Sequence, residues 1–137
     1  MTISVLLVED LGHIRGVMSE LLASLGDFAI VGEVATEAEA KLWVDENPGR
    51  WDLAVVDLIL EQGTGMGVIS KCKQALGTRV VVFSDYATPG IRQHCLKLGA
   101  DAVFQKATEM QAFIDWCSAL VAPTEPPKSP AAGRPAK

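Results

Sequence analysis

The feature of this sequence that most constrains its fold is a regular alternation of short apolar runs with longer amphipathic stretches. The five runs are rich in strand-forming residues and cover residues 3–8, 28–34, 53–57, 79–84 and 102–105. Each run precedes a stretch with apolar residues at three- and four-residue spacings, the pattern of a helix with one buried face. We expect helices over residues 11–25, from Thr36 to Pro48, and over 68–76, 88–98 and 108–121.

Local signals mark several of these boundaries. Gly26 is placed to end the first helix, and Thr36 with Glu39 three residues later forms the pattern of a capping box. Pro89 suits the first position of the fourth helix, and Gly99 follows its last residue. The glycine-rich segment 63–67 lacks the Lys-Ser/Thr of a phosphate-binding P-loop, so we expect a flexible loop there.

Five strand-helix units with short connections predict an α/β fold with one parallel sheet. Right-handed crossovers place helices on both faces of such a sheet. We assign this domain to residues 1–121. Residues 122–137 hold five of the seven prolines and no large apolar side chain, which predicts a disordered tail or linker. This segment contains two PxxP sequences, "PTEP" and "PKSP", which are either ligands for a partner protein or, more simply, part of a spacer.

The overall composition excludes several function classes. A net charge of -5 argues against direct nucleic-acid binding, which needs a basic surface. No apolar run approaches the ~20 residues of a membrane span, and the first residues do not resemble a secretory signal. Cys72, Cys95 and Cys117 are an odd number of widely spaced cysteines, which suggests reduced, buried thiols in a cytoplasmic protein.

The carboxyl ends of the predicted strands carry three acids, a hydroxyl and a lysine. They are Glu9, Asp10, Asp57, Ser84 and Lys106. In an open parallel sheet these ends gather along one edge, where ligands bind. Clustered carboxylates suit Mg2+, and Mg2+ neutralises charge on a transferring phosphoryl group. An ionised aspartate can form an aspartyl phosphate, and a lysine and a hydroxyl can hold its oxygens. The set therefore predicts a phosphate-accepting site.

Simpler interpretations exist for each residue taken singly. Glu9 and Asp10 suit the start of a helix, where acids complement the helix dipole. Ser84 is a common turn residue, and Lys106 could be a solvated strand end. Their coincidence at one edge favours the site. An FMN-binding protein of similar topology is less consistent, because the segment after the first strand is acidic where a phosphate would have to bind.

The sequence resembles the receiver domain of two-component response regulators from Ile3 to about Val121. The motifs that carry the resemblance are "VLLVED" before a helix, "DLAVVDLIL" with Gly65 eight residues beyond Asp57, "VVVFS" and "LGADAVFQK". The resemblance implies a flavodoxin-like strand order, 2-1-3-4-5.

The resemblance also implies a role for each residue at the strand ends. Asp57 corresponds to the phosphoacceptor, and Glu9 and Asp10 to the acidic pair that positions Mg2+ directly or through water. The backbone carbonyl of Ile59 would be a further ligand. Ser84 resembles the switch hydroxyl, and Lys106 the lysine that pairs with the phosphoryl group.

Several positions depart from the family pattern. Ala107 follows the lysine where the family has a proline in cis, and Val103 stands where it has a switch aromatic. Phe104 is adjacent to Val103, but strand alternation points it to the other face of the sheet. Asp85 replaces a small residue and adds a negative charge near the phosphoryl route. Glu61 replaces a common proline.

The expected function is a phosphorylation-activated switch without enzymatic output. Asp57 would take phosphate, with Mg2+, from a sensor histidine kinase or a histidine phosphotransfer protein. The signal would pass through the face formed by the fourth helix, fifth strand and fifth helix to an unidentified protein target. The alternative is a degenerate receiver that acts as a phosphorylation-independent docking module.

Overall fold

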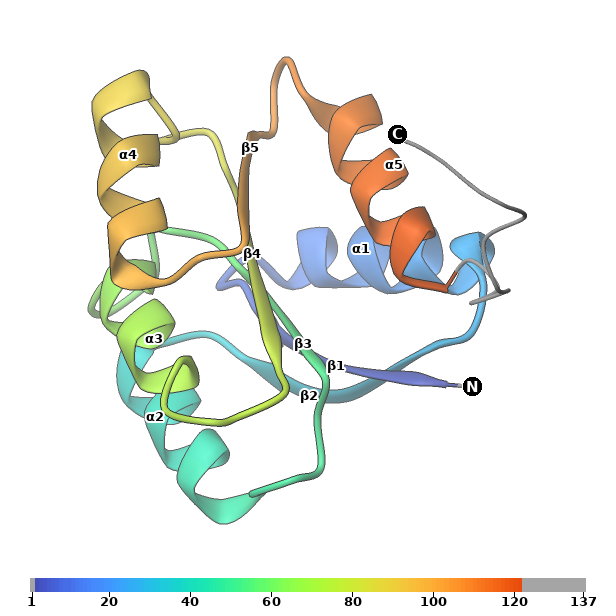
Figure 1. Ribbon diagram of the computed structural model, residues 1–137, viewed down its shortest axis with the longest axis horizontal. Coiled ribbons are helices and arrows are strands. Elements are labelled where there is room, and N and C mark those ends of the chain that lie inside the picture. The colour runs from blue at the N-terminus through green and yellow to red at the C-terminus, as the bar shows by residue number, and fades with distance from the viewer. Residues whose placement is uncertain (1, 122–137) are drawn as a thin grey trace, which may run out of the picture.

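Five parallel strands form one sheet in the order β2-β1-β3-β4-β5 (Figure 1). The strands are β1 (Ile3–Val8), β2 (Phe28–Val34), β3 (Leu53–Val56), β4 (Arg79–Ser84) and β5 (Ala102–Gln105). The helices are α1 (Gly12–Leu25), α2 (Glu37–Glu46), α3 (Gly65–Cys72), α4 (Pro89–Leu98) and α5 (Met110–Val121). This computed structural model describes residues 2–121, so the predicted tail at 122–137 lies outside the described residues. The expected α/β class and strand order are confirmed.

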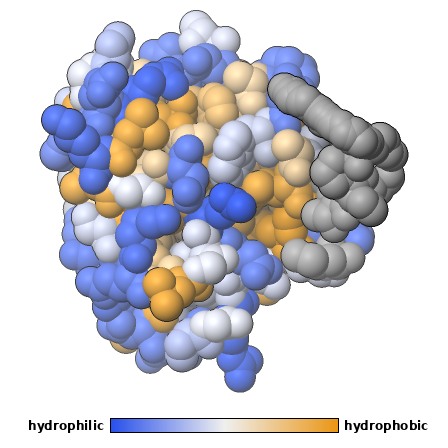
Figure 2. Space-filling model, in the orientation of Figure 1, coloured by the Kyte–Doolittle hydropathy of each residue, from blue (hydrophilic) through white to orange (hydrophobic). Residues whose placement is uncertain are grey.

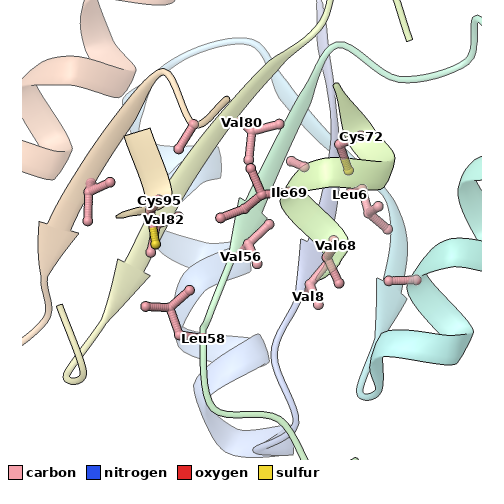
Figure 3. Packing of buried hydrophobic residues seen from close by; sticks show 14 of the residues in the cluster. Leu6, Val8, Val56, Leu58, Val68, Ile69, Cys72, Val80, Val82 and Cys95 are labelled. Carbon is pink, nitrogen blue, oxygen red and sulfur yellow. The ribbon is translucent and has the colours of Figure 1, made fainter. Parts of the chain in front are cut away.

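Each face of the sheet carries its own apolar core. One core, here called the α2–α4 core, joins alternate residues of the strands to α2, α3 and α4. Figure 3 shows part of this core, with Val56 of β3 near Val68 and Ile69 of α3. The other, here called the α1–α5 core, joins the intervening strand residues to α1 and α5. Because consecutive strand residues point to opposite faces, neighbouring positions of one strand serve different cores.

The order of the strands creates a switch point at the centre of the sheet. The chain passes from β1 outward to β2, then returns across β1 to β3 and continues to β5. The helices that leave β1 and β3, α1 and α3, therefore lie on opposite faces of the sheet. In such sheets a crevice opens at the carboxyl ends of these two strands.

Local capping follows the predicted signals. The Thr36 hydroxyl accepts a hydrogen bond from the Glu39 amide at 3.1 Å, and the Glu39 carboxylate accepts one from the Ala35 amide at 2.9 Å. The Thr88 hydroxyl caps α4 by accepting from the Ile91 amide at 3.4 Å, and Gly99 ends that helix in the left-handed conformation, with φ at 119°. These hydrogen bonds satisfy amides that the first turn of a helix leaves unpaired.

The predicted position of α3 was wrong. The helix covers Gly65–Cys72 rather than 68–76, so part of the expected glycine-rich loop is helical. It begins early because the Gly65 amide donates to the Leu58 carbonyl at 3.0 Å, which brings the chain back beside β3. It ends early because the amides of Gln74 and Ala75 donate to carbonyls only three residues back, a tightening into turns. The other elements agree with prediction to within two residues.

The surface mixes polar and apolar residues. On the face shown in Figure 2, hydrophobic areas are interrupted by hydrophilic side chains. Within residues 2–121, no helix has both the length and the apolar character that a membrane crossing requires.

Candidate functional site

The predicted site residues meet at the carboxyl edge of the sheet. Glu9 and Asp10 follow β1, Asp57 follows β3, Ser84 ends β4, and Lys106 follows β5. A pocket of about 330 Å³ opens at this edge. Its lining includes Asp10, Asp57, Ser84 and Lys106. The sequence prediction that these residues gather at one edge is confirmed in geometry.

Lys106 is the cation at the centre of the cluster. Its ammonium nitrogen lies 2.7 Å from Glu9 Oε1 and 2.9 Å from Asp57 Oδ2. Burial alone would lower the pKa of Lys106, but the hydrogen bonds to Glu9 and Asp57 outweigh it and leave that pKa raised. Lys106 is therefore positively charged at neutral pH and neutralises part of the negative charge of the site.

Glu9 is the most deeply buried acid of the set, with 3% of its surface exposed. Burial raises the pKa of the Glu9 carboxyl, and the Lys106 ammonium offsets this only in part. Its Oε2 atom also accepts a hydrogen bond from the Leu11 amide at 3.3 Å. The pKa values of Glu9 and Lys106 are both raised, as expected where two buried acids share a single cation. The site therefore has an excess of negative charge and favours additional positive charge.

Asp57 stands where the central strand emerges from the core. Its amide continues the β1–β3 ladder by donating to the Val8 carbonyl at 3.0 Å. Its Oδ1 atom accepts from the Ile59 amide at 3.3 Å, while Oδ2 faces Lys106. The residue is 9% exposed. The backbone thus fixes the carboxylate at the floor of the pocket, with limited but real access to solvent.

Ser84 is fully buried at the end of β4. Its hydroxyl oxygen accepts a hydrogen bond from the Tyr86 amide at 3.1 Å, and its carbonyl accepts from the Lys106 amide at 3.2 Å. In this conformation the hydroxyl serves the turn after β4, and the backbone ties β4 to the lysine loop. Ser84 also lines the pocket, within the same wall as Asp57 and Lys106.

The carboxylates are close enough to share a cation. Oxygen atoms of Glu9, Asp10 and Asp57 all lie within 4.8 Å of one another. Hard oxygen ligands of this kind, with open access on the pocket side, suit Mg2+ better than a softer metal. The donor set therefore fits the ion that the sequence predicted. Ile59, the predicted backbone ligand, lines the same pocket.

Two pocket residues and one supporting residue were missed by sequence reasoning. Leu11 and Tyr86 line the pocket, and both are about half exposed. Their signal was present, because Leu11 directly follows the acidic pair and Tyr86 lies two residues beyond Ser84. Asp85, predicted to add charge near the phosphoryl route, also lines the pocket.

Glu37 is the supporting residue, and it anchors the loop between β3 and α3. Its amide donates to the Gln62 carbonyl at 3.0 Å, and its Oε1 atom accepts from the Thr64 amide at 2.9 Å. The hydrogen bond from Lys41, followed by that from the Thr64 amide, lowers the pKa of the Glu37 carboxyl. The contact joins residues 27 positions apart, so no local pattern could reveal it.

The departures predicted in β5 are visible in the packing. Val103 lies in the α2–α4 core and is 4% exposed. Phe104 packs in the α1–α5 core, against the rings of Phe113 and Trp116 at centroid distances of 6.1 and 6.5 Å. The phenylalanine therefore does not substitute for an aromatic at position 103, as strand alternation predicted.

Comparison with known proteins agrees with the observed fold. The family model described as the response regulator receiver domain matches residues 5–117. A protein-glutamate methylesterase/protein-glutamine glutaminase from Chromobacterium violaceum is 29% identical over 83% of this chain and 32% of its own length. The transcriptional regulatory protein DesR of Bacillus subtilis is 25% identical over 76% of this chain and 51% of its own length. The chain thus spans a third to a half of these curated relatives.

A solved structure extends the likeness to three dimensions. It is a response regulator protein from Burkholderia pseudomallei with a phosphorylated aspartic acid, calcium ion and citrate. Its TM-score is 0.70 at 20% identity, over 91% of this chain and 76% of that one, which shows a shared fold.

The parallel five-stranded sheet and its family match define the class as a doubly wound α/β signalling domain. The chain belongs to the response regulator receiver domain family of two-component systems. Members of this family act as phosphorylation-activated switches.

Proposed function

We propose that this chain is a signalling switch that accepts a phosphoryl group on Asp57. The observation that carries the proposal is the cluster itself, in which Lys106 contacts Asp57 and Glu9 while Asp10 lies within 4.8 Å of both acids. The Lys106 ammonium, held between two buried carboxylates, neutralises part of their negative charge. Asp57 is the member that also faces the open pocket.

The transfer is a displacement at phosphorus. A carboxylate oxygen of Asp57 bonds to phosphorus while the bond to the donor nitrogen of a phosphohistidine breaks, and the electron pair leaves with the imidazole. Lys106 then pairs with a phosphoryl oxygen in place of a carboxylate oxygen. Ser84 turns its hydroxyl from the Tyr86 amide toward the phosphoryl group.

Mg2+ would be held by Asp10, Asp57 and the Ile59 carbonyl, with Glu9 acting directly or through water. Bound there, the ion would supply charge neutralisation for the transferring phosphoryl group. The structural neighbour from Burkholderia pseudomallei supports this assignment, since that protein of the same fold contains both a phosphorylated aspartic acid and a divalent cation, calcium.

The donor, the output and the domain limits of the switch follow from the same assignment. The phosphodonor would be a sensor histidine kinase or a histidine phosphotransfer protein, in the cytoplasm, and the output a protein contact. The chain would catalyse no reaction beyond formation and hydrolysis of its own acyl phosphate. Residues 1–121 would form the receiver domain and 122–137 a tail or linker.

One experiment tests the proposal. The protein is incubated with Mg2+ and acetyl phosphate, and intact mass is measured before and after hydroxylamine. We expect a gain of one phosphoryl group that hydroxylamine removes and that Asp57→Asn abolishes. Asp115→Asn, an exposed site on α5, is the matched control and should behave as wild type. No gain in the wild type, or an equal gain in Asp57→Asn, would refute the assignment.

The second candidate is a docking module that does not depend on phosphorylation. It is favoured by Asp85, which adds a negative charge to the pocket wall, and by Val103, which replaces the expected switch aromatic. The same experiment separates the two functions, because a docking module would show no hydroxylamine-sensitive gain.

A further inference from the structure

The loop that carries Lys106 is closed by Glu109. The Glu109 amide donates to the Gln105 carbonyl at 2.8 Å, and its Oε1 atom accepts from the Gln105 amide at 2.9 Å. The Thr108 hydroxyl also donates to Gln105 Oε1 at 2.7 Å. Residues 105–109 therefore form a tight turn that is held at both ends, with Lys106 on it.

Arg92 of α4 attaches to the same segment at two points. Its guanidinium donates to the carbonyl of Val103, before Lys106, and to the carboxylate of Glu109, after Lys106. A planar guanidinium can hold two acceptors in fixed directions, which a lysine ammonium cannot do as well. The backbone on either side of Lys106 is thus fastened to α4.

The other end of Lys106 lies in the phosphate site. Its ammonium contacts Asp57 Oδ2, so converting that carboxylate to an acyl phosphate changes the group to which Lys106 is bonded. Lys106 must then change its hydrogen-bond partner, which displaces or strains the loop that carries it. A change in this loop is felt by Arg92, because Arg92 of α4 donates hydrogen bonds to residues on both sides of Lys106.

We propose that Arg92 and Glu109 are positioning residues that couple the Lys106 loop to α4, so that α4 responds to the state of Asp57. The coupling rests on the proposed function of Asp57. It explains how β5 can communicate without an aromatic at position 103, since the Val103 side chain is buried and the connection runs through its backbone carbonyl.

Because Arg92 and Glu109 are partly exposed, their ion pair can be removed with little effect on folding stability. The side chains of Arg92 and Glu109 are 32% and 33% exposed. Ion pairs with this much solvent contact add little to folding stability. The hydrogen bonds from Arg92 and the Gln105 amide lower the pKa of Glu109, so the pair is fully ionised at neutral pH. Removing it should weaken communication while leaving the fold intact.

The test compares amide hydrogen exchange with and without Mg2+ and beryllofluoride, a phosphoryl analogue. In the wild type, we expect exchange to change both at residues 57–59 and across α4, residues 89–98. In Arg92→Gln and Glu109→Gln, beryllofluoride should bind within about threefold of wild-type affinity, as suits a partly exposed pair. The change at 57–59 should persist, and the change at α4 should be lost.

Two further variants sharpen the result. Lys97→Gln removes one exposed charge from the same helix and should respond as wild type. Arg92→Lys keeps the charge but not the two-point attachment, so it should lose the α4 response without a change in melting temperature.

Each contrary outcome is decisive. A wild-type α4 response in Arg92→Gln, Glu109→Gln or Arg92→Lys would overturn the coupling, and so would loss of beryllofluoride binding in these variants. A wild type that does not bind beryllofluoride would overturn the phosphoacceptor assignment together with the coupling. A wild type that binds it and changes at 57–59 but not at α4 would overturn the coupling alone.

Discussion

Gly65 lies so close to Asp57 that a Cβ atom at residue 65 would be 2.2 Å from the Asp57 carbonyl oxygen. It would also be 2.8 Å from a methyl group of Val56. The first residue of α3 must therefore be glycine for the chain to return beside the end of β3. The requirement concerns space rather than backbone conformation, because Gly65 is not among the glycines with positive φ.

Gly65→Ala should lower the free energy of unfolding by about 1–3 kcal/mol, the usual cost of overpacking a rigid contact. It should also slow phosphorylation of Asp57, because the strand end must shift. The matched control is Gly16→Ala in α1, where a Cβ meets nothing within 4 Å. The control should be neutral or stabilising by up to about 1 kcal/mol. Urea unfolding of both variants measures the difference, and equal stabilities would contradict the contact.

Lys106→Met removes the cation that Glu9 and Asp57 share. We expect the free energy of unfolding to fall by roughly 1.5–3 kcal/mol, the cost of losing hydrogen bonds to charged groups. Mg2+ should then raise the melting temperature of the variant more than that of the wild type, since a divalent cation can replace the missing charge. Lys97→Met is the control. An equal Mg2+ effect in wild type and Lys106→Met would show that the ion does not enter this cluster.

Asp85→Asn removes a negative charge from the pocket wall. Phosphorylation by acetyl phosphate, an anion, should become about threefold faster at low ionic strength, the size expected for one solvent-exposed charge a few ångströms away. The advantage should shrink as salt is added. Rates can be measured by intact mass, with Asp115→Asn as the control. A rate unchanged by the substitution at low salt would mean that Asp85 does not lie on the phosphoryl route.

The buried thiols predict a loss of stability at alkaline pH. Burial raises the pKa of the Cys72 and Cys117 thiols from the ordinary value of 9.0 to about 12. A raised native pKa means that the native state holds the proton longer, so the stability from these groups is intact below pH 9 and falls as the pH rises toward 12. Each thiol should contribute a slope of up to about 1.4 kcal/mol per pH unit. Lys106, whose pKa is also raised, adds to the loss of stability above the ordinary lysine pKa of 10.5.

Cys117→Ala tests the thiol contribution directly. The variant should be less stable at neutral pH because it leaves a cavity, but its stability should fall less steeply with pH. Leu22→Ala in the same α1–α5 core creates a cavity without a titrating group. Its curve should run parallel to that of the wild type. Parallel curves for wild type and Cys117→Ala would contradict the raised pKa.

The fold was predictable because its signals are local and repeat. Alternating apolar runs and amphipathic stretches gave the strands and helices, and the direction of parallel strands placed Glu9, Asp57 and Lys106 at one edge. The strand order came from family resemblance, since periodicity does not say which strands are neighbours. The early start of α3 was missed because a glycine-rich segment indicates a loop, while the contact of Gly65 with Asp57 is tertiary.

The connections around the site were not predictable for the same reason. Arg92 and Glu109 are 17 residues apart and partly exposed, and neither lies in a motif. Their pairing depends on how α4 and the loop after β5 lie against each other. The direction of Phe104, in contrast, followed from strand alternation alone, and the aromatic contacts confirm it.

The Glu37 anchor has a practical consequence for engineering this protein. A surface loop is ordinarily the safest place to insert a tag or a fluorescent reporter. Here the loop from Ile59 to Thr64 is tied to Glu37 of α2 at Gln62 and at Thr64, on either side of Gly63, and the residue after the loop must pack against Asp57. An insertion there would separate the points at which the loop contacts Glu37 and Asp57, and so would disturb both contacts. The turn at Leu76 and Gly77, at the opposite edge of the sheet, is the better attachment point, since Leu76 is 96% exposed and a Cβ at Gly77 meets nothing within 4 Å.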